Sequence, residues 1–86
     1  MEINSLIKTL ESKLKENFII NSLKIEDKSF LHKKHKNFDK AKFHIKLTIG
    51  SPEFNQMGSI EVNRKIHEIL KDEINISIHS LQIIIV

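Results

Sequence analysis

The feature that most constrains the fold of this chain is a strict alternation of apolar and polar side chains over residues 43–49. The segment reads FHIKLTI, so each odd position is apolar and each even position is polar. This period of two predicts a half-buried strand with one face on a core and the other toward water. Gly50 ends the pattern, so the strand is expected to stop there.

Helical periodicity is found at the start of the chain. One face of the predicted helix carries the apolar residues Ile3, Leu6, Ile7, Leu10, Leu14 and Phe18, with Lys and Glu between them. This spacing predicts an amphipathic helix over about residues 3–17. Asn21 and Ser22 break it, and the alternation over Leu23–Ile25 then predicts a short half-buried strand.

The second half of the chain reads as two helices and a strand. Ser51 is a predicted N-cap, with Pro52 in the first turn, and Gly58 can close this short helix. Ser59 can cap a second helix, whose apolar face is Val62, Ile66, Ile69, Leu70 and Ile74. Ile76–Val86 is rich in β-branched residues and predicts a strand that is buried on both faces near its end.

The resulting order is α-β-β-α-α-β. It predicts an α+β fold in a single domain over residues 1–86, with a three-stranded sheet and helices on one of its faces. The two adjacent helices are similar to a helix-turn-helix. Apolar residues make up 40% of the chain and no run is long enough to cross a bilayer. We therefore expect a soluble, cytoplasmic protein.

A basic segment separates the two predicted strands of the first half. The stretch Lys28–Lys42 contains six lysines and one aspartate, which predicts a long exposed loop. Loops of about 12–15 residues without secondary structure of their own are usually functional or disordered.

The chain has no cysteine and five histidines. It therefore has no thiolate for a metal site, a disulfide or thiol catalysis, and imidazoles are its only soft or borderline ligands. Any soft-metal chemistry must take its sulfur from a partner. No spacing typical of a catalytic triad, a phosphate-binding loop or a carboxylate pair is present, so we expect a protein that is not an enzyme.

His79 begins the last predicted strand in phase with Leu81, Ile83 and Ile85. This parity predicts that its side chain points toward the apolar side of the sheet. Two interpretations stay open: a histidine at the edge of the core that bonds a backbone carbonyl, or a metal ligand.

His32 and His35 form an H-x-x-H pair within the basic segment, beside Lys33 and Lys34. Such a pair can chelate a metal, but the lysines repel a bare cation and favour an anionic assembly that already carries thiolates. The alternative is a solvated basic loop. Two further histidines have simpler interpretations: His44 as a residue on the sheet surface and His67 as a solvated residue on a helix.

The segments in sequence order resemble the BolA family over nearly the whole chain. Leu23–Ser29, followed by His32, is similar to the family pattern L-x-V-x-D-E-S-x-x-H. The other matching segments are His44–Lys46 for H-F-x-V, Ser51–Phe54 for S-x-x-F, Ile60–Arg64 for the basic V-x-R-H-R helix and Ile78–Leu81 for V-H-A-L. Lys28, Ile45 and Gln56 depart from these patterns, and of the basic R-H-R triplet only Arg64 is retained.

The resemblance implies a type II KH-like fold and a monothiol glutaredoxin as partner. In such complexes a [2Fe–2S] cluster is bridged by the glutaredoxin cysteine, a glutathione thiol and ligands on the BolA side. Those ligands correspond here to His79 and to His32, with His35 as the reserve. The implied function is that of an adaptor in iron–sulfur cluster assembly, trafficking or iron sensing. Imidazole in place of thiolate on one iron raises the reduction potential of a cluster.

The same family resemblance implies a second function, regulation of transcription through nucleic-acid binding. The net charge of +3 permits this function without requiring it. The G-x-x-G clamp of KH domains is absent, since Gly50 and Gly58 are too far apart in the sequence. The residues that would contact DNA are Arg64, Lys65, Lys71, Lys33 and Lys34.

Overall fold

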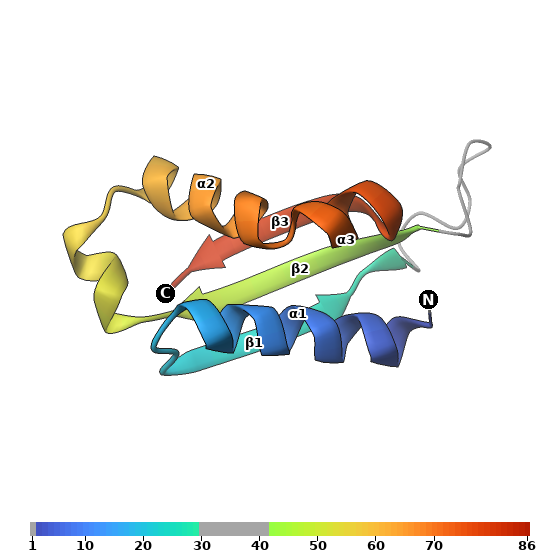
Figure 1. The fold of residues 1–86 in the computed structure, drawn as a ribbon, viewed down its shortest axis with the longest axis horizontal. Coiled ribbons are helices and arrows are strands. Elements are labelled where there is room, and N and C mark those ends of the chain that lie inside the picture. Colours follow the sequence, from blue (N-terminus) through green and yellow to red (C-terminus); the bar gives the residue numbers. More distant parts are fainter. Residues whose placement is uncertain (1, 30–41) are drawn as a thin grey trace.

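The computed structural model describes residues 2–29 and 42–86 and has the predicted order of elements (Figure 1). These elements are α1 (Ile3–Asn17), β1 (Ser22–Asp27), β2 (Phe43–Gly50), the 3-10 helix η2 (Pro52–Gln56), α2 (Ser59–Ile69), α3 (Lys71–Ile76) and β3 (Ile78–Ile85). Most of the predicted loop over Lys28–Lys42 lies outside the described residues. No helix in the described ranges has the length and apolar character that a membrane span requires.

The strands form one sheet in the order β1-β2-β3. β1 pairs antiparallel with β2, and β2 pairs in parallel with β3. A parallel pair needs a long crossover, which η2, α2 and α3 supply here. Figure 1 shows α1, α2 and α3 on the same side of this sheet. The predicted α+β architecture, with helices on one face, is therefore confirmed.

The core lies between the helices and the sheet face that they cover, which we call the covered face. Its members are almost entirely inaccessible to water: Leu6, Leu10 and Leu14 of α1, Ile45, Leu47 and Ile49 of β2, and Val62, Ile66 and Leu70 from the α2–α3 layer. Burial of an aliphatic side chain of this size contributes roughly 1.5–3 kcal/mol. The opposite face, which we call the open face, carries His44, Lys46 and Thr48 of β2, and no described element packs over it.

Helix α2 begins one residue differently from the sequence-based expectation. Gly58 is the N-cap, and Ser59 is the first helical residue and not the cap. The cause is the extended backbone at Gly58, whose carbonyl accepts the Val62 N–H at 3.1 Å and closes the first helical turn. The other predicted cap is confirmed, because Ser51 Oγ accepts the Glu53 N–H at 3.1 Å at the start of η2.

The helix predicted to extend to Ile74 is divided at Leu70, which lies between α2 and α3. The backbone there has φ −97° and ψ 15°, outside the α-helical region. Leu70 is fully buried, and the following turn carries Glu73 to α1, where Lys13 Nζ lies 2.9 Å from both carboxylate oxygens.

The end of β3 is less buried than predicted. Ile83, Ile84 and Ile85 are each half-buried, so the prediction of a strand buried on both faces is wrong. The physical reason is the position of β3 at the edge of the sheet, combined with helices on one face alone. Ile84 pairs with Thr48 and shares the open face with it.

Candidate metal site on the open face

The strand pairing next to His79 is irregular. Phe43 pairs with Ile78, but the next residue, His44, pairs with Ser80, so His79 is an extra residue in β3. An extra residue of this kind re-aims a side chain and interrupts the alternation of faces. His79 is accordingly exposed. The prediction that it points toward the apolar side is wrong, because the irregularity lies between it and the in-phase residues Leu81, Ile83 and Ile85.

The irregularity places His79 beside His44. The two imidazole centroids are 4.8 Å apart and the ring planes are inclined at 52°. His44 is half-buried and, as predicted, lies on the surface of the sheet. Its proximity to His79 was missed by the sequence reasoning. The two segments that resemble H-F-x-V and V-H-A-L could have revealed it. They lie on β2 and at the start of β3, and the parallel register of these strands sets them side by side.

Hydrogen bonds hold His44 in place through its side chain and its backbone. Its Nδ1 lies 2.6 Å from Ser80 Oγ on the neighbouring strand. Its N–H donates to Ser29 Oγ at 3.0 Å, and its carbonyl accepts the Lys28 N–H at 2.7 Å. Ser29 is itself fixed, since its N–H donates to Asp27 Oδ1 at 2.9 Å. The pair therefore stands on a rigid part of the sheet.

The electrostatic environment of the open face is dominated by lysines around one glutamate. Glu26 Oε1 lies 3.2 Å from Lys28 Nζ and 3.7 Å from Lys24 Nζ. The hydrogen bond from Lys28, with the positive charges of Lys24 and Lys46, lowers the pKa of the Glu26 carboxyl below its usual value. Positive charge therefore exceeds negative charge beside the histidine pair, which favours an anionic guest.

The described residues contain no cluster of three or more His, Cys, Asp or Glu side chains that could enclose a metal ion. His44 and His79 are thus a pair, and further ligands would come from water, from a partner or from the rest of the chain. The predicted loop ligands His32 and His35, with Lys33 and Lys34, lie outside the described residues.

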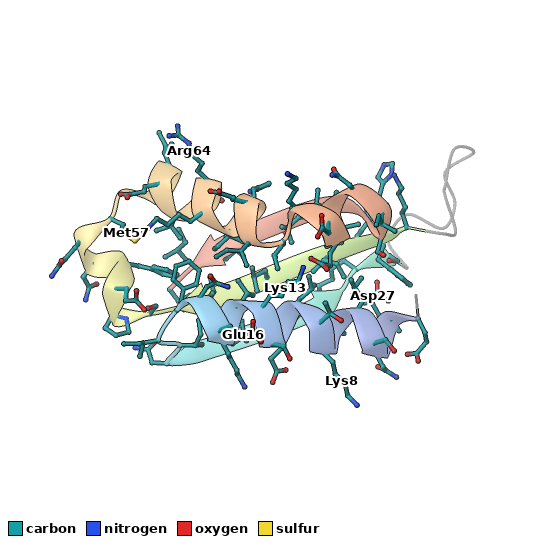
Figure 2. All side chains as sticks on the ribbon, viewed as in Figure 1. Lys8, Lys13, Glu16, Asp27, Met57 and Arg64 are labelled. Atoms are coloured by element: carbon teal, nitrogen blue, oxygen red, sulfur yellow. The ribbon has the colours of Figure 1, made fainter. Side chains whose placement is uncertain are left out.

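The remaining predicted nucleic-acid residues lie on the helical side of the molecule. Arg64 and Lys65 are exposed on α2, and Lys71 is exposed at the start of α3. Figure 2 shows Arg64 pointing away from the sheet. His67 is exposed on the same helix, where its Nδ1 lies 2.9 Å from the Asn63 carbonyl oxygen. These basic residues and the histidine pair occupy different layers of the fold.

Known proteins resemble this chain in sequence. The family model described as BolA-like protein matches residues 14–86. The DNA-binding transcriptional regulator BolA of Haemophilus influenzae is 30% identical over 77 residues, which cover 90% of this chain and 72% of that protein.

Solved structures of BolA proteins resemble this chain in fold. BolA1 from Arabidopsis thaliana superposes with a TM-score of 0.79 at 25% identity, covering 93% of this chain and 88% of that chain. The BolA domain of SufE1 from the same organism gives a TM-score of 0.76 at 28% identity, covering 91% and 86%. Sequence and fold agree, and this chain belongs to the BolA family.

Proposed function

We propose that this chain is a non-catalytic adaptor in iron–sulfur cluster assembly, trafficking or iron sensing. In this proposal it shares a [2Fe–2S] cluster, as cargo, with a monothiol glutaredoxin and glutathione. The observation that carries the proposal is the exposure of His79, which the irregular pairing turns out of the sheet. A solvent-facing imidazole on a strand can reach a ligand held by a second protein.

The donor chemistry of this chain fits such a cargo. Histidine replaces cysteine on one iron of Rieske-type [2Fe–2S] centres, so imidazole is a competent ligand. The chain has no cysteine, and the thiolates therefore come from glutaredoxin and glutathione. The excess of lysine around Glu26 favours the negative charge that thiolate ligands give to a cluster.

The second ligand in this proposal is His32, with His35 as the reserve. The segment that carries both histidines leaves the described structure after Ser29 and returns at Lys42. Both of its anchors are close to the histidine pair: Ser29 Oγ accepts the His44 N–H, and the Phe43 N–H donates to the Ser77 carbonyl at 2.8 Å. The described residues that flank this segment therefore lie close to the histidine pair, which supports the choice of His32 or His35 as second ligand.

The experiment mixes the chain with a monothiol glutaredoxin loaded with a [2Fe–2S] cluster and glutathione, and records the visible circular dichroism. We expect the wild type to change the spectrum, and His79→Ala to abolish that change because one ligand is lost. His67→Ala is the matched control, since it removes an exposed histidine from another layer of the fold, and it should behave as the wild type. Identical spectra for wild type and His79→Ala would reject His79 as a ligand. Absence of any complex with the wild type would reject the adaptor function.

A second candidate function is DNA binding, favoured by the name of the Haemophilus influenzae relative. The contact residues would be Arg64, Lys65 and Lys71 on the helical side, with Lys33 and Lys34. Binding through phosphates should weaken with salt, with a log–log slope of about −0.9 for each phosphate neutralised. Arg64→Ala should reduce that slope, and Lys8→Ala, an exposed cation on α1, should not. No binding in a titration at low salt would dispose of this function.

A further inference from the structure

We propose that the outer edge of strand β3, which we call the β3 edge, binds the same edge of a second copy of this chain. The two β3 strands pair antiparallel about a twofold axis and join two three-stranded sheets into one continuous sheet. This inference concerns the free protein and goes beyond the adaptor function, which uses the open face of the sheet and not its edge.

The backbone of β3 leaves hydrogen-bonding groups on this edge, because β3 has a neighbouring strand on one side alone. The Val86 N–H donates to the Ile49 carbonyl at 3.0 Å, so Val86 and every second residue before it direct their backbone groups toward β2. The intervening residues Leu81, Ile83 and Ile85 direct theirs outward. Within residues 2–29 and 42–86, no hydrogen bond reaches these outward groups. Such a row of groups is a template for a further strand.

The two edges of the sheet differ in charge. β1, at the other edge, carries Lys24, Glu26 and Asp27. Charged side chains on an edge strand discourage pairing with a further strand. No Asp, Glu, Lys, Arg or Pro occurs in residues 74–86, which include the whole of β3. The β1 edge is therefore protected by charge, and the β3 edge is not.

The side chains at the end of β3 determine which strand fits this edge. Ile83 and Ile85 are only half-buried on the covered face, and Ile84 is half-buried on the open face. Val86 is 67% exposed. Side chains directly opposite each other in a strand pair pack together. A strand that binds here therefore needs apolar residues on both of its faces and no charge.

β3 itself meets this requirement. Two identical antiparallel strands are related by twofold symmetry, so a charged strand would bring like charges together, and β3 has none. Its regular part begins at Ser80, after the extra residue His79, and has its midpoint at Ile83. Pairing about this midpoint joins the outward groups of each Ile83 to those of its counterpart. On the open face it sets Gln82 opposite Ile84 of the copy.

The size of this contact predicts a weak dimer. Residues 80–86 span only about 20 Å of strand, and stable interfaces bury about 1,200–2,000 Å² of surface in total. We therefore expect an association that depends on the concentration of the chain. Both open faces lie on the same side of the joined sheet and stay uncovered, so dimerisation and cluster sharing use different surfaces.

The test measures the mass of the full chain by sedimentation equilibrium from micromolar to millimolar concentration, without glutaredoxin. We expect the mass to rise with concentration from 10.1 kDa toward twice that value. Ile84→Lys should keep the chain monomeric, because it places a charge on the uncharged edge strand. Thr48→Lys is the matched control. Thr48 pairs with Ile84 within the chain, so this variant adds the same charge one strand away from the edge and should dimerise as the wild type does.

Two further measurements test the register. Adding Gln82→Glu to Ile84→Lys sets a carboxylate opposite the lysine of the copy, so this double variant should dimerise again. Hydrogen exchange followed by NMR requires no substitution. In the wild type, the amides of Leu81, Ile83 and Ile85 should exchange more slowly at millimolar than at micromolar concentration, because pairing bonds them.

Several outcomes would overturn the proposal. They are a monomer at every concentration, masses that grow beyond the dimer, a dimer that survives Ile84→Lys, equal loss in Thr48→Lys, and no recovery in the double variant. If Ile84→Lys fails to fold by far-ultraviolet circular dichroism, the amide exchange of the wild type decides, and exchange that is independent of concentration rejects the pairing. The adaptor function is tested separately at His79, so either result can fail without the other.

Discussion

The two faces of strand β2 (Phe43–Gly50) differ in how far they are exposed to water. Ile45, Leu47 and Ile49 on the covered face are at most 2% exposed, whereas His44 and Lys46 on the open face are half-buried. Helices pack over the first set, and polar pairs surround the second. The difference indicates that the covered face determines the fold, and that the open face is free to carry chemistry.

The energies of the two faces should differ accordingly. A buried aliphatic side chain contributes through removal from water and through close packing. The pairs of the open face, such as Glu26 with Lys28, are half-buried and remain in contact with solvent, and ion pairs at the surface contribute roughly 0–1 kcal/mol. Substitutions on each face test whether these contributions differ.

The largest effect is expected from Leu47→Ala on the covered face. Truncation of a buried leucine leaves a cavity and costs about 2–5 kcal/mol of unfolding free energy. Its neighbour Thr48 points to the open face, so Thr48→Ala should cost far less. Urea denaturation of both variants measures the difference. Equal losses would show that the two faces are not energetically distinct.

An intermediate effect is expected at high pH from the pair between Lys13 and Glu73 in the helical layer. The hydrogen bond to Glu73 raises the pKa of the Lys13 ammonium above its ordinary value of 10.5. Its stabilising effect is complete below that value and is lost as the pH rises through the raised pKa. Between about pH 10 and 12, the wild type should therefore lose more unfolding free energy than Lys13→Met.

The control for this experiment is Lys8→Met, which removes an exposed lysine from the same helix. Because Lys8 is exposed and its substitution leaves the Lys13–Glu73 pair in place, this variant should follow the pH dependence of the wild type. If Lys13→Met also follows the wild type, the pair does not contribute to stability through charge.

A smaller effect on stability is expected from His79→Ala. Its side chain is exposed on the open face, and surface substitutions of this kind change the unfolding free energy by less than about 0.5 kcal/mol. The same variant should lose the spectrum of the shared cluster. Thermal unfolding of His79→Ala and His67→Ala, measured under the same conditions, compares the stability of the two variants. A large destabilisation by His79→Ala alone would instead indicate a structural role.

The smallest effect is expected in acid, at Glu26. Lys28 holds the pKa of this carboxyl below its usual 4.5, so its contribution to stability is present above that value and is lost as the pH falls through the lowered pKa. Lys28→Met should return the pKa toward the usual value. The carbon chemical shift of the Glu26 carboxyl, followed by NMR from neutral to acid pH, measures this. An unchanged midpoint would mean that Lys28 does not bond Glu26 in solution.

Hydrophobic periodicity was sufficient to predict the covered face. The helical spacing of Leu6, Leu10 and Leu14 placed α1 at its observed bounds, and the alternation from Phe43 to Ile49 placed β2. These patterns can be seen within each segment alone. Burial of one face requires an apolar residue at each turn of a helix or at every second residue of a strand. The predicted α-β-β-α-α-β order follows from them.

The open face could not be derived in the same way. The extra residue at His79 depends on how β3 pairs with β2, and a register is a property of two strands far apart in the sequence. Parity counted within β3 alone therefore placed His79 on the wrong side and concealed its neighbour His44. The same limit applies to Leu70, where the helix is divided although the local pattern would continue it.

The most direct test of the central claim, that the open face beside His79 meets the glutaredoxin, is an NMR titration of the isotopically labelled chain with cluster-loaded glutaredoxin. We expect the strongest changes on His79, Ser80 and His44, with the exposed side of α2 around Arg64 little affected. Changes centred on Arg64 and Lys65, with His79 and its neighbours unaltered, would contradict it.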